Sequence, residues 1–147
     1  MVASVEKAGT VDYYDTFQEA LDSTPTSGKP EDCTFTLLKY IEIDDFLGIN
    51  GKSFTYKVLN GAAINFTKSY HYVNIDNDTD GNPSNVIMDG DIYFGKIRLG
   101  GKSSLKTTEK TTIGWLFDTF RTYRPGQLCC CNQRQRTHRQ LPRIIFW

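Results

Sequence analysis

Residues 1–120 of this chain contain a single cysteine, Cys33, because the other three cysteines stand together at positions 129–131. No disulfide can therefore form within the first 120 residues, which must fold around an apolar core. No stretch approaches the ~18 consecutive apolar residues of a membrane-spanning helix, so we expect no membrane span. Residues 1–10 also lack the basic start and apolar middle of a secretory signal peptide. A cytoplasmic product, a removed signal and a piece of a longer chain all stay open.

Residues 121–147 contain no lysine, aspartate or glutamate, yet they carry six arginines and a net charge of +6. Residues 1–120 hold all 17 acidic residues against 11 basic ones, which gives a net charge of −6. Such an asymmetry is typical of a basic tail that contacts an acidic partner or nucleic acid.

Three interpretations of this tail stay open. It can be a nucleic-acid arm whose arginines neutralise phosphates, a disordered extension, or a segment that is not native to the body. We favour the third, because a change of reading frame would remove every Lys, Asp and Glu abruptly. We predict a folded body over residues 1–120 and a Cys- and Arg-rich tail over 121–147 that is disordered or not native. Zinc binding by the tail is disfavoured, because adjacent thiolates chelate poorly.

Helical periodicity is scarce, whereas short runs of alternating apolar and polar residues fill residues 33–108. Such period-two alternation predicts half-buried β-strands, because successive side chains leave opposite faces of the pleat. Turns that contain Gly, Asn or Asp separate the runs. The predicted strands are Thr34–Leu38, Ile41–Ile43, Ser53–Val58, Ile64–Thr67, Tyr70–Ile75, Val86–Met88, Ile92–Phe94, Lys96–Leu99 and Ser103–Thr108, preceded by one around Val11 and Tyr13.

One segment, at about residues 15–22, predicts a helix. Thr16 and Glu19 fit a capping box, in which the Thr16 hydroxyl accepts a hydrogen bond from a first-turn amide. Two prolines and a glycine in Ser23–Pro30 end the helix after barely two turns. We interpret it as a lid over the open end of a β core, with an apolar face formed by Phe17, Ala20 and Leu21.

Residues 76–81 read Asp-Asn-Asp-Thr-Asp-Gly. Carboxylates at every second position before a glycine form the first half of an EF-hand-type calcium loop. The second half is missing, because Ile87 occupies the position of the bidentate glutamate and strands flank the motif. A solvated acidic turn between two strands is the alternative. The candidate ligands for calcium are Asp76, Asp78, Asp80 and Asn82, with Asp89 or Asp91 available from a neighbouring turn.

Catalytic groupings are scarce. We expect His71 to be a half-buried, hydrogen-bonded histidine on a strand, without a nucleophile beside it. A carboxylate pair for sugar hydrolysis can be drawn from Glu42, Asp89 and Asp91, as in any acidic strand-rich domain. No phosphate loop, dinucleotide fingerprint or nucleophile elbow is present. We therefore assign no catalytic residue.

The candidate ligand-binding residues are Tyr70, Tyr72 and Tyr93. Tyrosines on the outer face of strands can form an aromatic platform on which sugar rings stack. Ordinary packing of the rings on the sheet is the alternative.

The order of motifs near the N-terminus resembles that of a known family. The segments concerned are Tyr-Tyr-Asp-Thr-Phe-Gln-Glu-Ala-Leu at 13–21, Thr-Phe-Thr-Leu-Leu-Lys at 34–39, Ile-Asn-Gly-Lys-Ser-Phe-Thr at 49–55 and Val-Leu-Asn-Gly at 58–61. They resemble the opening of bacterial surface proteins with a right-handed parallel β-helix of the pectate-lyase-like type, well over residues 11–67 and loosely over 84–108. The resemblance implies a capping helix followed by stacked β-coils, in large secreted or wall-attached adhesins and carbohydrate-active proteins.

The predicted fold is therefore all-β, a short right-handed β-helix or solenoid with one N-terminal capping helix, with a β-sandwich as the alternative. The two differ in strand pairing, because a solenoid stacks parallel strands and a sandwich pairs antiparallel ones. The chain is shorter than the family's usual members, and the resemblance places no catalytic set in it.

The predicted function is a non-catalytic extracellular or cell-surface module that binds glycans or cell-surface proteins. It can be a fragment of a larger surface protein. The first alternative is a fragment of a polysaccharide lyase or glycoside hydrolase. The second is nucleic-acid binding through the arginine tail.

Overall fold

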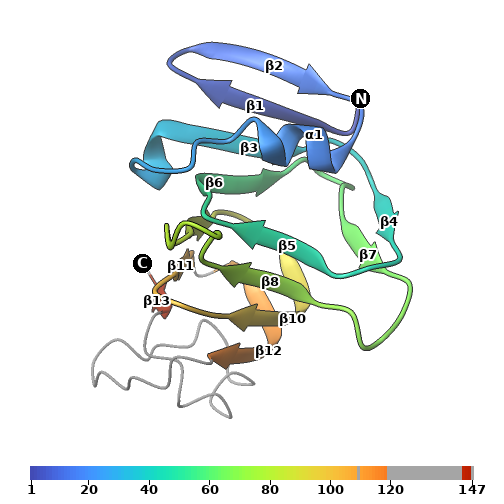
Figure 1. Cartoon of the computed structure of the whole chain (residues 1–147). Coiled ribbons are helices and arrows are strands. Elements are labelled where there is room, and N and C mark those ends of the chain that lie inside the picture. Colours follow the sequence, from blue (N-terminus) through green and yellow to red (C-terminus); the bar gives the residue numbers. More distant parts are fainter. Residues whose placement is uncertain (109, 119–143, 147) are drawn as a thin grey trace.

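The computed structural model describes residues 1–108, 110–118 and 144–146. Within them the chain winds into a β-solenoid of about four turns, in which strands of successive turns stack in parallel (Figure 1). One short α-helix lies near the N-terminus. The predicted all-β solenoid with a helix at this position is therefore confirmed.

Sheet A is the largest sheet, with seven strands in the order β13-β11-β9-β6-β3-β1-β2. Five of its strands come from successive turns and run parallel, whereas β1 lies antiparallel to both of its neighbours. The bounds are Ala3–Lys7 for β1, Thr10–Tyr14 for β2, Cys33–Leu37 for β3, Ser53–Val58 for β6, Asn85–Met88 for β9, Ser104–Thr107 for β11 and Ile144–Phe146 for β13.

Sheets B and C complete the turns. The first two turns contain a strand from each sheet, and the next two pass directly from sheet A to sheet C. Sheet B has two parallel strands, β4 (Ile41–Ile43) and β7 (Ile64–Phe66). Sheet C has four parallel strands, which are β5 (Leu47–Asn50), β8 (Val73–Asp76), β10 (Tyr93–Leu99) and β12 (Thr112–Asp118).

The parallel register decides between the two predicted folds. Phe35 lies opposite Tyr56, and Tyr56 lies opposite Met88, so the same face of each strand stacks on the next turn. A β-sandwich would pair these strands antiparallel. The sandwich alternative is therefore wrong for this chain.

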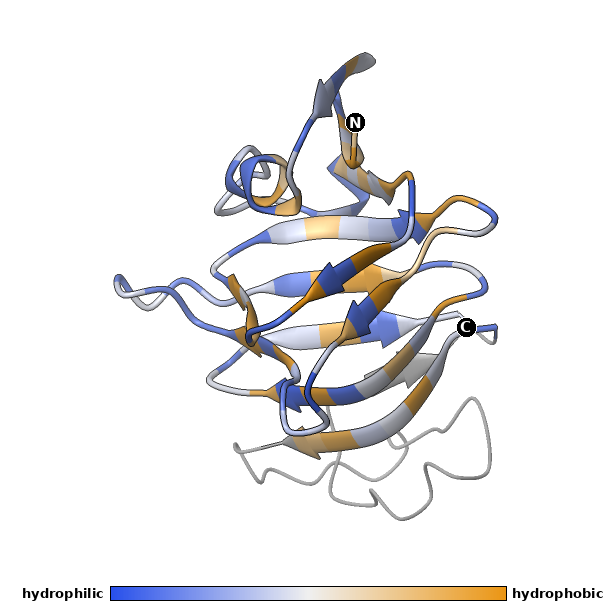
Figure 2. Cartoon of the chain, turned by 90° about the vertical axis from the view of Figure 1, so that its right-hand side faces the viewer, coloured by the Kyte–Doolittle hydropathy of each residue, from blue (hydrophilic) through white to orange (hydrophobic). Residues whose placement is uncertain are grey.

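The core is a continuous column of inward-pointing side chains. On β3, Cys33, Phe35 and Leu37 are buried, while the intervening threonines are only partly covered. Figure 2 shows this alternation of hydrophobic and hydrophilic residues along the strands. Burial of the Cys33 thiol raises its pKa, and burial of the Tyr56 phenol raises its pKa, as expected for groups in an apolar column.

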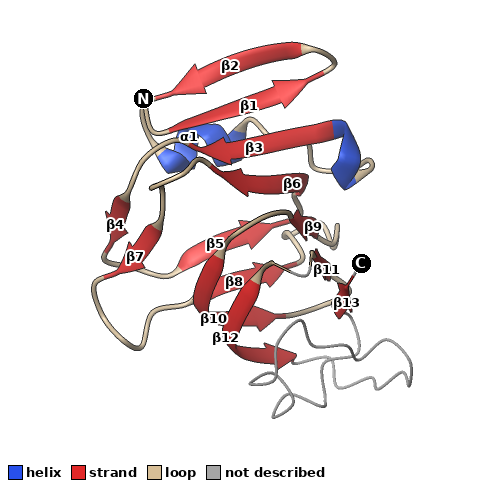
Figure 3. Cartoon of the chain, turned by 180° about the vertical axis from the view of Figure 1, so that it is seen from behind, coloured by secondary structure: helices blue, strands red, loops and turns tan. Residues whose placement is uncertain are grey.

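A hairpin and a helix close the N-terminal end (Figure 3). The hairpin consists of β1 and β2, and α1 spans Phe17–Asp22. The Thr16 hydroxyl accepts a hydrogen bond from the Glu19 amide at 3.1 Å, which confirms the predicted N-cap. The apolar residues of α1 belong to the core cluster, so the helix covers the end of the column. A short 3-10 helix, Pro30–Asp32, then leads into β3.

Strand β10 is one strand where the alternation predicted two. Its buried residues Phe94 and Ile97 are three positions apart, so the alternation of inward and outward side chains shifts by one residue at Gly95. On β12, Gly114 stacks against the same point, and a Cβ there would lie 2.9 Å from the Gly95 carbonyl oxygen. The sheet therefore bends at two stacked glycines, which alternation alone does not reveal.

Two buried serines at the corner between sheets C and A predict opposite effects of the same substitution. The Ser84 hydroxyl accepts from the Lys52 amide and lies within donating distance of two backbone oxygens, Asp76 at 2.9 Å and Ile49 at 3.1 Å. The Ser53 hydroxyl has no partner among the described residues. We expect Ser84→Ala to lower the free energy of unfolding by about 1–3 kcal/mol. Ser53→Ala should leave it unchanged or raise it slightly, because an unsatisfied hydroxyl is removed.

Urea unfolding of both serine variants beside the unmodified chain measures this difference. Equal losses in the two variants would contradict the assignment of hydrogen bonds at this corner.

The basic tail falls largely outside the described residues. Only β13 is described within it, as a parallel strand beside β11. The prediction that 121–147 is disordered or not native to the body stays a prediction.

Candidate functional site

The outer face of sheet C carries a groove with a volume of about 630 Å³. Aromatic side chains form most of its wall, and two basic side chains stand among them. The lining residues come from successive turns, so the groove exists only once the solenoid has wound. Tyr70 and Tyr72 lie in the segment before β8 and not on the strand predicted from Tyr70, whereas the other lining residues are on β10 and β12. Its lining residues are Tyr70, Tyr72, Lys96, Ile97, Arg98, Trp115 and Phe117.

Strand register places the groove residues side by side. Lys96 of β10 lies opposite Trp115 of β12, and Arg98 lies opposite Phe117. Parallel in-register stacking brings such residues about 4.8 Å apart, the spacing between strands. Trp115 is 50% exposed and Phe117 is 37% exposed, so both present ring surface outward. The groove therefore combines apolar ring faces with cationic hydrogen-bond donors.

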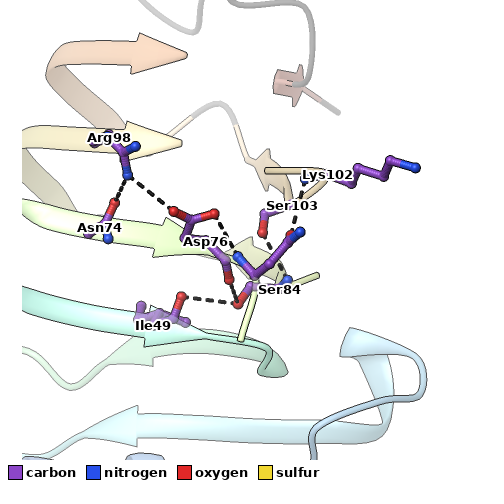
Figure 4. A network of polar contacts seen from close by, with 8 residues as sticks. Ile49, Asn74, Asp76, Ser84, Arg98, Lys102 and Ser103 are labelled. Carbon is purple, nitrogen blue, oxygen red and sulfur yellow. Dashed lines mark hydrogen bonds and ion pairs between the residues drawn. The ribbon is translucent and has the colours of Figure 1, made fainter. Parts of the chain in front are cut away.

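Arg98 is held in place by the neighbouring strand. Its Nη1 atom donates to Asn74 Oδ1 at 2.5 Å and to Asp76 Oδ2 at 3.2 Å, as Figure 4 shows. The Arg98 and Asp76 side chains are 31% and 29% exposed, so the ion pair is partly shielded from water. A guanidinium has five N–H donors, so this anchoring leaves donor capacity on the groove side. The arrangement fixes the orientation of Arg98 before any ligand binds.

The structure brings two of the three predicted tyrosines together. Tyr70 and Tyr72 both line the groove, although only Tyr70, at 60% exposure, is fully at the surface. Tyr72 packs edge-on against Phe46, with ring centroids 4.7 Å apart. Tyr93 lies at the start of β10, where it lines separate hollows beneath β7. Ligand binding by these tyrosines stays a prediction.

Trp115 and Phe117 are groove residues that the sequence analysis missed. They lie on β12, which it did not predict as a strand. The signal was present, because Thr112–Asp118 contains a run of apolar residues with two large aromatic side chains. Gly114 hides this strand from a search for alternation, because the pattern shifts by one residue there. The inward-pointing residues Ile113 and Leu116 are three positions apart, whereas regular alternation would place them two or four apart.

The predicted metal loop replaces a short corner of the solenoid. The corners of the neighbouring turns read Gly51-Lys52-Ser53 and Gly101-Lys102-Ser103, whereas the second turn inserts residues 77–83 before Ser84. The Asp78 carboxylate organises this insertion by accepting from the Asn82 side chain at 3.0 Å and from the amides of Asn82 and Asp80 at 2.8 and 2.9 Å.

These hydrogen bonds lower the pKa of the Asp78 carboxyl, with the Asn82 side chain as the largest cause. The stabilisation they provide is present above the ordinary carboxyl range and is lost as the pH falls through the lowered value. Asp76 lies one strand position before the loop and accepts from the Asn77 amide at 2.7 Å in addition to Arg98. Among the described residues, no three His, Cys, Asp or Glu side chains gather as a metal site would require.

Calcium binding by Asp76, Asp78, Asp80 and Asn82 stays a prediction, and the thermal midpoint of the chain tests it directly. Millimolar calcium should raise the thermal midpoint of the full chain by about 3 °C or more relative to excess chelator, if the ion is bound. Asp80→Asn should reduce that rise, because it removes one anionic ligand and leaves the hydrogen bonds of Asp78 in place. Equal midpoints in calcium and chelator, by scanning fluorimetry, would exclude the site.

His71 and the acidic residues considered for catalysis do not line the groove. His71 is 9% exposed, between the rings of Phe46 and Tyr70, and its Nδ1 atom has no hydrogen-bond partner among the described residues. His71 is thus more deeply buried than the expected half-buried state, it lies before β8 and not on the strand, and the expected side-chain hydrogen bond is absent at Nδ1 within the described part of the chain. Asp89 forms an ion pair with Lys57 at 3.6 Å.

Comparison with protein-family models, with curated proteins and with solved structures returned no match to this chain. Within the part of the chain that the structure describes, no helix is long and apolar enough to cross a membrane. The arginines proposed for nucleic-acid binding lie outside the described residues, so that alternative stays a prediction. The groove on sheet C is thus the feature on which a functional proposal can rest.

Proposed function

We propose that this chain is a non-catalytic, extracellular glycan-binding module, part of a bacterial surface protein of the right-handed parallel β-helix type. The groove on the outer face of sheet C supports this proposal. Its volume of about 630 Å³ is large enough for a few sugar rings.

The chemistry of the groove suits a glycan. Pyranose rings have apolar C–H faces that pack flat on aromatic rings such as Tyr70 and Trp115. Their hydroxyl groups need planar, oriented hydrogen-bonding partners, which Arg98 supplies from an orientation held by Asn74. Ligand sites of this kind combine an apolar surface with a few fixed polar groups. A cell-surface protein is the alternative partner for the same groove.

Binding assays with a panel of immobilised glycans test the proposal. We expect the chain to retain at least one glycan, and Tyr70→Ala and Trp115→Ala each to weaken retention by about tenfold. Tyr40→Ala is the matched control, because Tyr40 is 52% exposed but precedes β4 on a different side of the solenoid. Unchanged thermal midpoints would show that the variants fold.

Two outcomes would overturn the proposal. The first is the absence of binding to every glycan in the panel, or equal weakening by Tyr40→Ala. The second is release of unsaturated products or new reducing ends from a polysaccharide, with loss of that turnover in Asp89→Asn or Asp91→Asn, which would favour the enzyme alternative.

A further inference from the structure

Sheet B ends abruptly at β7. The first two turns supply β4 and β7, but the third turn passes from β9 to β10 through a short turn at residues 89–92. The structure therefore places no strand of the described chain beside the second edge of β7. This leaves a step in the solenoid on the side that Figure 2 faces.

The backbone of β7 directs hydrogen-bonding groups toward that step. The Ile41 amide donates to the Ala63 oxygen, and the Thr67 amide donates to the Ile43 oxygen. These two bonds show which residues of β7 direct their backbone groups toward β4. Bonds to one neighbour involve alternate residues of a strand. The amides and carbonyls of Ile64 and Phe66 consequently face away from β4, where no described residue bonds to them.

Two adjoining hollows lie beneath this edge. Their volumes are about 260 and 380 Å³, and they share Ile64, Tyr93 and Phe94 as lining residues. Ile64 and Phe66 pack against the core but are only partly buried, because no strand of the third turn covers them. The step therefore offers pockets with mixed apolar and polar lining directly below unpaired backbone groups. An extended strand meets both requirements, whereas a compact ligand would leave the backbone groups unpaired.

Charges stand at both ends of the step. Lys96 lines the larger hollow, and its ammonium group donates to the Ser69 carbonyl at 2.7 Å, which leaves two of its three N–H groups for another partner. Asp91 lines the smaller hollow at the opposite end of β7. A strand with a basic residue at its start and an acidic residue at its end would complement both charges if it runs parallel to β7.

Strand β4 shows what fits an edge of β7. Its apolar residues Ile41 and Ile43 lie opposite Ile64 and Phe66, and Asp44 after it accepts from Thr67 Oγ1 at 2.6 Å and from Lys68 Nζ at 3.1 Å. These contacts lower the pKa of the Asp44 carboxyl, with the Thr67 hydrogen bond as the largest cause. The second edge of β7 presents the same apolar spacing and, in Lys96, a cation at the same end.

We propose that the free edge of β7 binds an extended peptide segment of a partner protein by parallel strand addition. The segment takes the place of the missing sheet B strand of the third turn. Its alternate apolar side chains enter the two hollows, a basic residue approaches Asp91, and an acidic residue approaches Lys96. This protein-binding site adjoins the glycan groove, with which it shares Lys96 as a lining residue.

A peptide copied from the chain itself is the probe. The fluorescent nonapeptide Leu-Lys-Tyr-Ile-Glu-Ile-Asp-Asp-Phe has the sequence of residues 38–46, which provides the apolar spacing and both end charges. We expect saturable binding to the full chain by fluorescence anisotropy. Lys96→Glu should weaken it by about tenfold, whereas Lys102→Glu, the same charge change on a distant corner, should not.

N-methylated peptides test the pairing itself. In a parallel strand with its isoleucines opposite Ile64 and Phe66, the peptide's Glu42 and Asp44 amides face β7, while its isoleucine amides face away. N-methylation of those Glu and Asp residues should therefore weaken binding at least about tenfold, and N-methylation of both isoleucines should be tolerated. Equal binding of all three peptides, the reverse order, or no binding of the unmodified peptide would overturn the proposal. Glycan retention is measured separately, so failure here leaves the proposed function untouched.

Discussion

Phe35→Ala should lower the free energy of unfolding by about 3–5 kcal/mol, the range for an aromatic side chain removed from a core. Phe35 is fully buried at the junction between the N-terminal cap and the first turn. Its ring centroid lies 4.8 Å from that of Phe17 in α1, 5.5 Å from Phe54 and 5.8 Å from Tyr56. The truncation would open a cavity that rigid strands on two sides cannot close.

Urea unfolding followed by far-ultraviolet circular dichroism measures this loss. Tyr13→Ala is the control, because Tyr13 is 58% exposed on the edge strand β2 and its removal should cost less than about 1 kcal/mol. Phe35→Leu keeps most of the volume and should lose less than about half as much as the alanine variant. A loss of similar size in the Tyr13 and Phe35 alanine variants would contradict the central position of Phe35.

Gly51→Ala should be the second severe substitution, with a loss of about 2–4 kcal/mol. Gly51 has a φ of +69°, which disfavours any side chain. A Cβ there would also lie 2.6 Å from Asp78 Oδ2 and 2.8 Å from Asp78 Cβ. Asp78 cannot simply rotate aside, because its carboxylate holds the inserted loop through three hydrogen bonds.

Gly61→Ala separates the backbone strain from the steric clash. Gly61 has a φ of +88°, but a Cβ there would meet no atom within 4 Å. Its alanine variant should lose only about 1–2 kcal/mol, the cost of a left-handed residue with a side chain. The extra loss in Gly51→Ala, read from paired thermal and urea unfolding curves, reports the packing of the acidic loop on its neighbouring corner. Equal losses in both variants would show that this packing contributes nothing.

The Gly51 contact bears on the calcium prediction as well. Gly51 and Gly100 flank the loop from the turns on either side, and a Cβ on Gly100 would lie 2.8 Å from the Asp76 carboxylate. The carboxylates of Asp76 and Asp78 thus fit between bare backbones and already accept hydrogen bonds from the protein. A bound cation would need to share these oxygens, which makes the calcium titration a demanding test of the loop.

The candidate sites were only partly predictable. Local sequence identified Tyr70 and Tyr72 as surface aromatics, but their meeting with Trp115 depends on two further turns of the solenoid. The step beneath β7 had no local signature, because it arises from a strand that the third turn lacks. Strand β5 was also missed, although its residues Leu47 and Ile49 alternate with polar or small ones and are buried.

The sequence by itself determined the class of the fold, the capped helix and most strand positions. These depend on neighbours two to four residues apart, so alternation, a capping threonine and turn residues were sufficient. Tertiary structure alone decided the groove, the edge of β7 and the one-residue shift of the alternation at Gly95 and Gly114. Each depends on which strands stack on one another. Packing between residues far apart in the chain sets that pairing, and a local sequence period carries no information about it.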